Sequence, residues 1–115
     1  MIENTSNPFG SPIIDPTSHL HANGKRAVAI SLMGITAMTK LSSKAYNMLS
    51  YICANLEKDD DGLIKIDRND YMTQYKVKSQ ATVVNALNEL IETGFILKSS
   101  KQSTYWVNPN KVIAI

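Results

Sequence analysis

The sequence has little cysteine and no long apolar run. Its 115 residues include one cysteine, Cys53, so no intrachain disulfide can form and a reducing compartment is expected. No apolar run reaches the roughly 20 residues that a membrane-spanning helix needs. Residues 1–7 are polar and lack the basic-then-apolar pattern of a secretory signal. We therefore expect a cytoplasmic protein without a membrane partner.

Patterns typical of enzymes are also missing. The sequence contains no glycine-rich phosphate loop, no paired metal ligands and no nucleophile elbow. His19 and His21 stand close together, but a metal site would need further ligands near them. Cys53 falls on the apolar stripe of an expected helix, where a thiol is inert. We expect no catalytic activity, no cofactor, no metal and no small-molecule ligand.

Charge of either sign is scarce. Charged residues make up 19% of the chain, and twelve Lys and Arg against ten Asp and Glu give a formal net charge of +2. Such a weak basic excess says little by itself about nucleic-acid binding. Apolar residues make up 43%, so the chain suits one compact domain with a buried core.

The start of the chain differs in composition from the rest. Pro8, Pro12 and Pro16 alternate with glycine, asparagine, serine and threonine. Proline restricts φ and donates no backbone hydrogen bond, so this stretch is expected to be extended or disordered. We therefore divide the chain into a flexible N-terminal arm, residues 1–26, and a folded domain, residues 27–115.

Apolar periodicity predicts the order of elements in the domain. The expected elements are a strand at 27–32, a short helix at 33–40, a helix at 42–56, a strand at 63–67, a short helix at 67–75, a helix at 80–93 and a hairpin with strands at 95–98 and 104–107. Tyr105 and Trp106 alternate sides of a strand, so one is expected in the core and the other against a partner. The apolar tail, residues 111–115, either pairs as an extra strand or packs against another copy.

The two longer helices carry signals at their ends and on one face. Ser42 or Ser43 is expected to cap the first by accepting from backbone N–H groups, and Ser79 is expected to cap the second. Gly94 follows the second helix, where a left-handed residue commonly ends a helix. The expected inward residues are Ala45, Met48, Leu49, Ile52, Cys53 and Leu56 on the first helix and Val83, Leu87, Leu90 and Ile91 on the second.

The order helix, strand, short helix, turn, longer helix and hairpin is typical of one class of domain. We expect an α+β fold of the winged helix-turn-helix class, with a three-helix core and a C-terminal β-hairpin wing. In this class the longer helix presents its N-terminal half, and an α-helix has the right diameter for the major groove of DNA. This order predicts sequence-specific binding to double-stranded DNA.

The candidate DNA contacts are short polar or basic side chains around the longer helix. Gln and Asn can bond adenine, Ser and Thr can bond bases or phosphate, and Val suits a thymine methyl group. The expected outward residues of the helix are Ser79, Gln80, Thr82, Val84 and Asn85. The expected phosphate contacts are Lys76 and Lys78 before the helix and Lys98 and Lys101 at the hairpin tip, with Arg68 and Lys44 as weaker candidates.

Charge is distributed unevenly around these candidates. Residues 76–101 carry four lysines, and their only acids are Glu89 and Glu92 at the far end of the helix. Residues 57–70 carry six acids and three basic residues, so they are expected to face away from DNA. The asymmetry is modest, which predicts moderate affinity for each domain and a homodimer on a repeated site.

Other interpretations of the same pattern stay open. Gln, Asn, Ser and Thr on an exposed helix face are often only solvated surface, and four lysines in such a segment are not unusual. A winged helix that assembles a protein complex without touching DNA is an alternative of another class. An RNA-binding winged helix is a third, with no dedicated support in the sequence.

Three segments resemble those of one family, the RepL-type plasmid replication proteins. Residues 41–45 (LSSKA) are similar to the start of the family's first domain helix, and residues 79–90 (SQATVVNALNEL) resemble its recognition helix. Residues 105–110 (YWVNPN) are similar to the aromatic, aliphatic and Asn-Pro-Asn ending of its wing. The resemblance covers roughly residues 27–113 and implies a plasmid or phage protein that binds a replication origin or its own promoter. The family's Arg-Gly continuation is missing, so a transcriptional or copy-control repressor is the alternative to an initiator.

Overall fold

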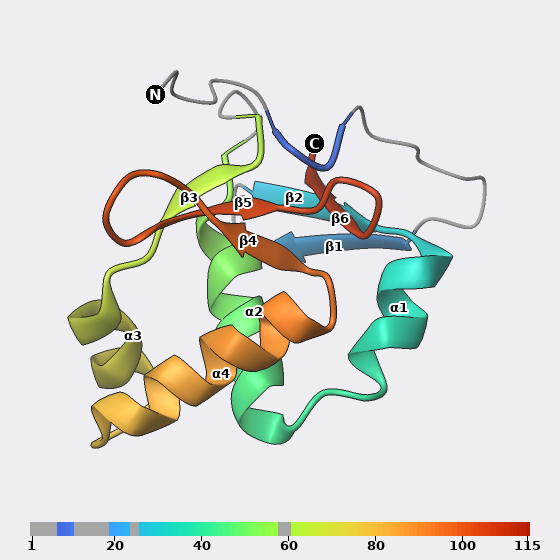
Figure 1. Cartoon of the computed structure of the whole chain (residues 1–115). Coiled ribbons are helices and arrows are strands. Elements are labelled where there is room, and N and C mark those ends of the chain that lie inside the picture. Colours follow the sequence, from blue (N-terminus) through green and yellow to red (C-terminus); the bar gives the residue numbers. More distant parts are fainter. Residues whose placement is uncertain (1–6, 11–18, 24–25, 58–60) are drawn as a thin grey trace.

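A computed structural model of the chain describes residues 7–10, 19–23, 26–57 and 61–115. These residues form a small α+β fold with four helices and two three-stranded antiparallel sheets (Figure 1). The elements are β1 (His19–Asn23), β2 (Arg26–Ile30), α1 (Leu32–Met38), α2 (Ser43–Asn55), β3 (Leu63–Lys65), α3 (Arg68–Gln74), α4 (Gln80–Glu92), β4 (Ile96–Lys98), β5 (Thr104–Val107) and β6 (Val112–Ala114). The predicted elements of the domain are therefore confirmed, with ends that differ by a few residues.

The core forms where α2 packs against α4 beneath the sheets (Figure 1). The inward stripes expected from the three- and four-residue spacing are confirmed. The fully buried helix residues include Ala45, Met48, Leu49 and Ile52 of α2 and Val83, Leu87 and Leu90 of α4. Cys53 and Ile91 lie at the edges of these stripes and are partly buried.

Two of the three expected helix-end signals are present, at the start of α2 and at the end of α4. Ser42 caps α2, because its hydroxyl oxygen accepts from the Ala45 N–H at 3.2 Å. Gly94 follows α4 with a φ of +81°, and the next N–H, that of Phe95, donates to the Leu90 carbonyl at 2.9 Å. This reversal turns the chain directly from α4 into β4.

The C-terminal tail pairs as a strand. Strand β6 lies beside β2, with Val112 opposite Ile30, and completes the sheet of order β1-β2-β6. The chain that leads into β6 passes so close to α1 that a Cβ on Gly34 would lie 2.5 Å from the Lys111 carbonyl oxygen. Only glycine fits this approach. Of the two possibilities for the tail, the structure shows the extra strand.

The expected N-terminal arm differs from the structure where it is described. Strand β1, which falls inside residues 1–26, pairs with β2 as a hairpin, so the boundary expected at residue 26 cuts through paired backbone. Asn7 is buried, and its side-chain amide donates to the Val107 carbonyl at 2.8 Å. The composition of residues 1–26 predicts a flexible segment. It cannot show that distant residues such as Val107 will pair with this segment. The remainder of the arm lies outside the described residues.

Strand β5 corrects a second expectation. Tyr105 and Trp106 are both buried, with 4% and 6% of their surface exposed, so neither is a free partner contact. Tyr105 belongs to the core, whereas Trp106 lies on the other face of the sheet between Leu63 and Leu97 of the neighbouring strands. Because β5 is the central strand of the sheet β3-β5-β4, each of its side chains has a cross-strand neighbour on both sides.

Candidate functional site

A tight turn sets helix α4 against helix α3. Lys76 has a φ of +55°, a conformation that non-glycine residues rarely adopt, and the N–H of Val77 donates to the Met72 carbonyl at 2.9 Å. Asp67 caps α3 by accepting from the Asp70 N–H at 3.1 Å. A short connection, residues 75–79, therefore joins α3 to α4, and a hydrogen bond back to α3 holds it.

Helix α3 is fixed to α2 through tyrosines. The Tyr51 hydroxyl donates to the Asp70 carboxylate at 2.8 Å, and burial followed by this hydrogen bond raises the pKa of Tyr51 to about 12. The ring of buried Tyr71 meets that of Tyr51 edge to face at 5.5 Å between centroids and stacks on Tyr75 at 5.0 Å. These contacts hold α3, and with it the turn into α4, at one orientation to the core.

The face of α4 opposite to α2 presents a row of small and polar side chains between residues 81 and 88. The buried residues of α4 face α2, so the opposite face is open, and Val84 keeps 37% of its surface exposed. We name this row the α4 ridge; its exposed members are Ala81, Val84, Asn85 and Asn88. The expected exposure of Val84 and Asn85 is confirmed. Ala81 and Asn88 were missed, although their spacing of three and four from the other two residues places them on the same face.

Two other expected contacts lie on the flanks of α4. Gln80 and Thr82 are about 200° apart around the helix, since each residue turns the chain by about 100°. Gln80 is exposed, whereas Thr82 is half-buried on the opposite flank. Ser79 stands at the cap position and is exposed, but its side chain makes no capping hydrogen bond, so the expected cap is wrong. The five residues predicted to face outward therefore do not form one row.

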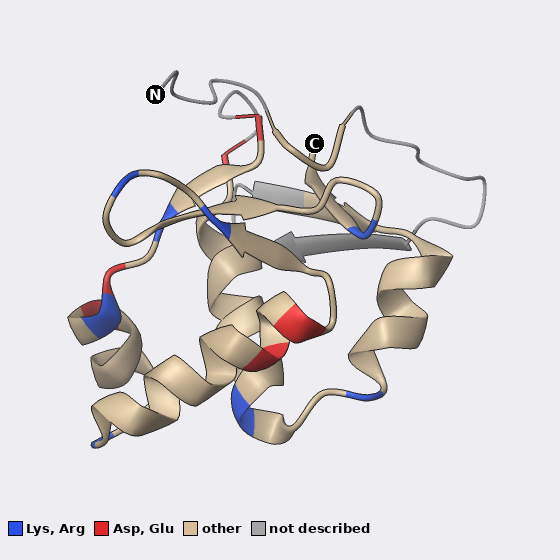
Figure 2. Ribbon diagram, in the orientation of Figure 1, with Lys and Arg blue, Asp and Glu red and all other residues tan. Residues whose placement is uncertain are grey.

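The four candidate lysines lie on one side of the molecule. Lys76 and Lys78 are exposed in the turn before α4, and Lys98 and Lys101 are exposed on the β4–β5 hairpin. Figure 1 shows the N-terminal end of α4, helix α3 and the hairpin tip together on the left side. Figure 2 shows basic residues at the turn and hairpin, and acidic residues on the C-terminal half of α4. The expected separation of charge along α4 is present in space as well as in sequence.

A groove joins these elements. It has a volume of about 350 Å³ and lies where the β3–α3 connection, the start of α4 and the hairpin meet. Two cationic side chains, Lys65 and Arg68, line it together with Gln80 and Ser103. Arg68 is therefore better placed than Lys44, which is exposed in the first turn of α2. The pattern of β3 gave no reason to single out Lys65, which occupies an ordinary solvent-facing strand position.

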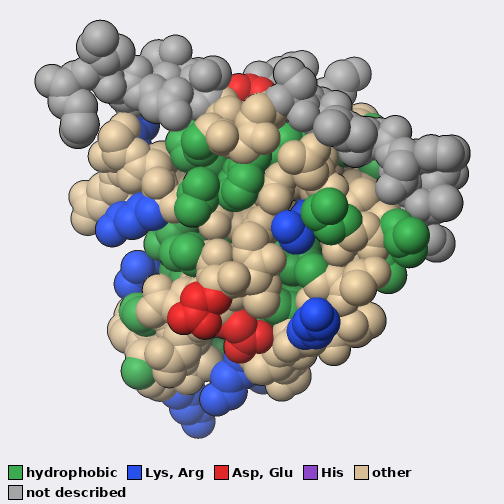
Figure 3. Space-filling view, turned by 45° about the vertical axis from the view of Figure 1, so that its right-hand side comes forward, with side chains coloured by type: hydrophobic (Ala, Val, Ile, Leu, Met, Phe, Trp, Pro, Cys, Tyr) green, Lys and Arg blue, Asp and Glu red, His purple; other side chains and the backbone are tan. Residues whose placement is uncertain are grey.

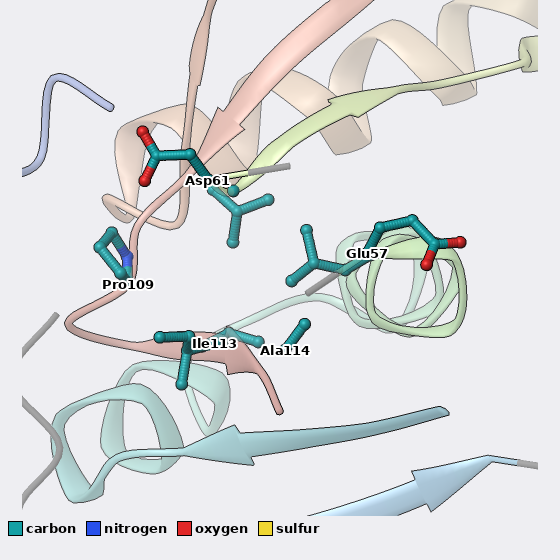
Figure 4. A pocket seen from close by; sticks show the side chains of 9 residues that line it. Glu57, Asp61, Pro109, Ile113 and Ala114 are labelled. Atoms are coloured by element: carbon teal, nitrogen blue, oxygen red, sulfur yellow. The ribbon is translucent and has the colours of Figure 1, made fainter. Parts of the chain in front are cut away.

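A second pocket lies between the end of α2, the end of β5 and strand β6. It has a volume of about 100 Å³ and is lined mostly by apolar side chains such as Val107 and Ile113. Figure 4 shows the carboxylates of Glu57 and Asp61 pointing away from this pocket. Burial raises the pKa of the Cys53 thiol to about 12, which keeps it protonated. Among the described residues no group of three or more His, Cys, Asp or Glu side chains is arranged to hold a metal.

Helix α1 contributes a separate apolar surface. Leu32 and Met33 expose 52% and 57% of their surfaces and line an open groove with Lys40 and Thr93. Figure 3 shows, on the face turned forward there, acidic side chains gathered over the end of α4 with hydrophobic side chains scattered around them. This surface shares no residue with the α4 ridge or with the groove beside Arg68.

The longest helices among the described residues have 13 residues, too few to cross a membrane. No protein-family model matches the chain, and no match is found among curated proteins or solved structures.

Proposed function

We propose that this chain is a winged helix-turn-helix domain that binds double-stranded DNA in a sequence-specific manner. The observation that carries the proposal is the exposed α4 ridge, with basic residues in the turn before the helix and on the β4–β5 hairpin. In this arrangement α3 and α4 form the helix-turn-helix and the β4–β5 hairpin is the wing. Helix α4 enters the major groove while α3 crosses the backbone.

Base recognition is assigned to the α4 ridge. The side-chain amides of Asn85 and Asn88 can each donate and accept, which matches the N6 and N7 pattern of adenine. Val84 lies on the same face and can contact a thymine methyl group. Ser79 at the start of the helix can reach a base edge or a phosphate. Thr82 is half-buried on one flank of α4, so it can contact only DNA atoms beside that flank.

Phosphate binding is assigned to the lysines. Lys76 and Lys78 lie in the turn before the recognition helix, and Lys98 and Lys101 extend the same basic side to the wing. Each lysine that neutralises a phosphate releases a counterion, so affinity falls as salt rises. The net charge of +2 predicts that this attraction is moderate.

The biological role that we propose follows from the resemblance to RepL-type plasmid replication proteins. The protein would bind repeated or palindromic sites at a replication origin or promoter, either as an initiator or as a repressor of copy number. A homodimer fits this role, because one helix reads only a few base pairs.

The test is selection from a randomised duplex library, followed by fluorescence anisotropy at two salt concentrations. We expect an enriched site whose affinity falls steeply with salt. Asn85→Ala should weaken that site about tenfold, because one bidentate base contact contributes about 1–3 kcal/mol. Thr36→Ala, an exposed change on α1, is the matched control and should bind like wild type. Equal affinity of Asn85→Ala and Thr36→Ala for the selected site would contradict the assignment of the ridge.

A second candidate is a winged helix that binds another protein. The exposed Val84 in the centre of the ridge favours it, since apolar side chains often form the centre of protein interfaces. The two functions differ in their response to salt. If the chain binds no duplex even at low salt, the protein-interaction function replaces the DNA-binding one.

A further inference from the structure

The groove beside Arg68 differs in shape from the surface around the other basic residues near α4. Lys76, Lys78 and Lys101 are exposed side chains on turns, whereas Lys65 and Arg68 converge on one concave surface between three elements. The groove also contains amide and hydroxyl groups from Gln80 and Ser103. Cationic and neutral donors that converge on a hollow are suited to an anion with several oxygen atoms.

The backbone around the groove is held in place. The Ile66 N–H donates to the Ser103 carbonyl at 2.8 Å, which ties the hairpin to the end of β3. Lys65 lies opposite Thr104 in the β3–β5 ladder. One carboxylate, that of Asp67, also lines the groove, but it already accepts from the Asp70 N–H as the cap of α3. Two cations therefore face one carboxylate that is already hydrogen-bonded.

Gln80 belongs to this groove by its position on the helix. It lies about 100° around α4 from Ala81 and about 140° from Asn85, but only about 40° from Val84. Gln80 therefore lies at the edge of the ridge, where it also lines the groove with Ser103 and Arg68. A side chain in this position can meet the DNA backbone at the edge of the major groove while Asn85 faces the bases.

We propose that Lys65, Arg68 and Gln80 form a binding site for one backbone phosphate of the DNA duplex, and that Gln80 sets the position of α4 without reading a base. The inference rests on the proposed function. The planar guanidinium of Arg68 supplies two parallel donors to the phosphate oxygens, Lys65 adds a second charge, and Gln80 adds a neutral donor. The phosphate held there fixes how far α4 enters the groove.

The experiment measures the affinity of the full chain for its selected duplex and for a scrambled duplex over a series of salt concentrations. Arg68→Gln should weaken both duplexes by the same factor, about tenfold at low salt, because a hydrogen bond to a charged group is lost. Its plot of log affinity against log salt should be shallower by about 0.9. Gln80→Ala should also weaken both duplexes equally, with an unchanged slope. In both variants the ratio of the two affinities stays that of wild type.

Two controls separate the possible outcomes. Lys40→Gln removes an exposed positive charge on the α1 side and should bind both duplexes like wild type. Asn85→Ala should lower the affinity ratio, since it removes a base contact. Urea unfolding of each variant confirms that folding is unaffected.

The proposal fails if Arg68→Gln binds like Lys40→Gln, or if Gln80→Ala lowers the affinity ratio as Asn85→Ala does. In either case the wild-type chain still binds DNA and the proposed function stands. If wild type binds no duplex, both proposals are overturned together.

Replacing chloride by inorganic phosphate at equal ionic strength tests whether free phosphate binds at the same site. A loss of duplex affinity in wild type that is smaller in Arg68→Gln shows that free phosphate competes with the DNA backbone at this site and supports the proposal. An equal loss in both proteins contradicts it.

Discussion

The two halves of helix α4 differ in what they contact. In the C-terminal half, the Glu89 carboxylate accepts from the Ser42 N–H at 2.7 Å and from the Ser42 hydroxyl at 2.9 Å. Just beyond the helix, the Asn108 side chain donates to the Gly94 carbonyl at 2.9 Å. In the N-terminal half, the ridge residues Ala81, Val84 and Asn85 are exposed and Ser79 makes no capping hydrogen bond.

This difference separates stability from recognition along one helix. The C-terminal half is joined to the start of α2 and to the chain after β5, so its position is determined by several elements at once. The N-terminal half depends on the apolar face beneath it and leaves its polar face available. A recognition helix needs this division, because side chains that bond to the protein itself cannot bond to a partner.

The largest effect that would test the comparison comes from Leu90, which is fully buried in the C-terminal half. Leu90→Ala should lower the free energy of unfolding by about 2–5 kcal/mol, since it removes buried methyl groups and leaves a cavity. Val84→Ala on the ridge should change it by less than about 0.5 kcal/mol. Urea unfolding measures both. Similar losses in the two variants would show that both halves are equally integrated.

A smaller effect is expected at Asn108, which is buried and bonds to the end of α4. Its side-chain oxygen also accepts from the Asn110 N–H at 3.0 Å. Asn108→Ala should lower the free energy of unfolding by about 1–3 kcal/mol, because it leaves the Gly94 carbonyl without this donor. The matched control is Asn88→Ala on the ridge, which should be close to neutral. A comparable loss of stability in Asn88→Ala would show that Asn88 makes a contact that stabilises the fold.

The smallest expected effect concerns Ser42, which caps α2 and also bonds to Glu89. Ser42→Ala should lower the free energy of unfolding by about 1 kcal/mol, the usual loss for a helix cap. Ser43→Ala, one residue further on, makes the same chemical change without removing the cap and should have little effect. A double-mutant cycle with Glu89→Gln measures the coupling energy between Ser42 and Glu89, which is the contribution of their contact to the attachment of α4. A zero coupling energy would mean that the contact does not brace α4.

Features that depend on a few neighbouring residues could be predicted from the sequence. The stripe on α4, the cap at Ser42 and the left-handed Gly94 were of this kind, since helix periodicity and end signals act within one or two turns. The candidate site was predicted in part. Exposure of Val84 and Asn85 was right, whereas Thr82 was placed on the open face and Asn88 was not considered.

Features that join distant parts of the chain could not be predicted in this way. The burial of Asn7 depends on Asp61 and Val107, and that of Trp106 depends on which strands flank β5. The groove beside Arg68 exists only because β3, α4 and the hairpin meet there.

Between residues 26 and 107, the amino-acid sequence by itself determined which segments are helices and strands, their order and which face of the two longer helices is apolar. Local backbone preferences and the period of the apolar residues are sufficient for that. The tertiary structure decided which end of α4 is anchored, that the N-terminal chain contributes a strand, and that Lys65, Arg68 and Gln80 share one groove. These depend on contacts between residues far apart in the sequence, and no local pattern records which partners will meet.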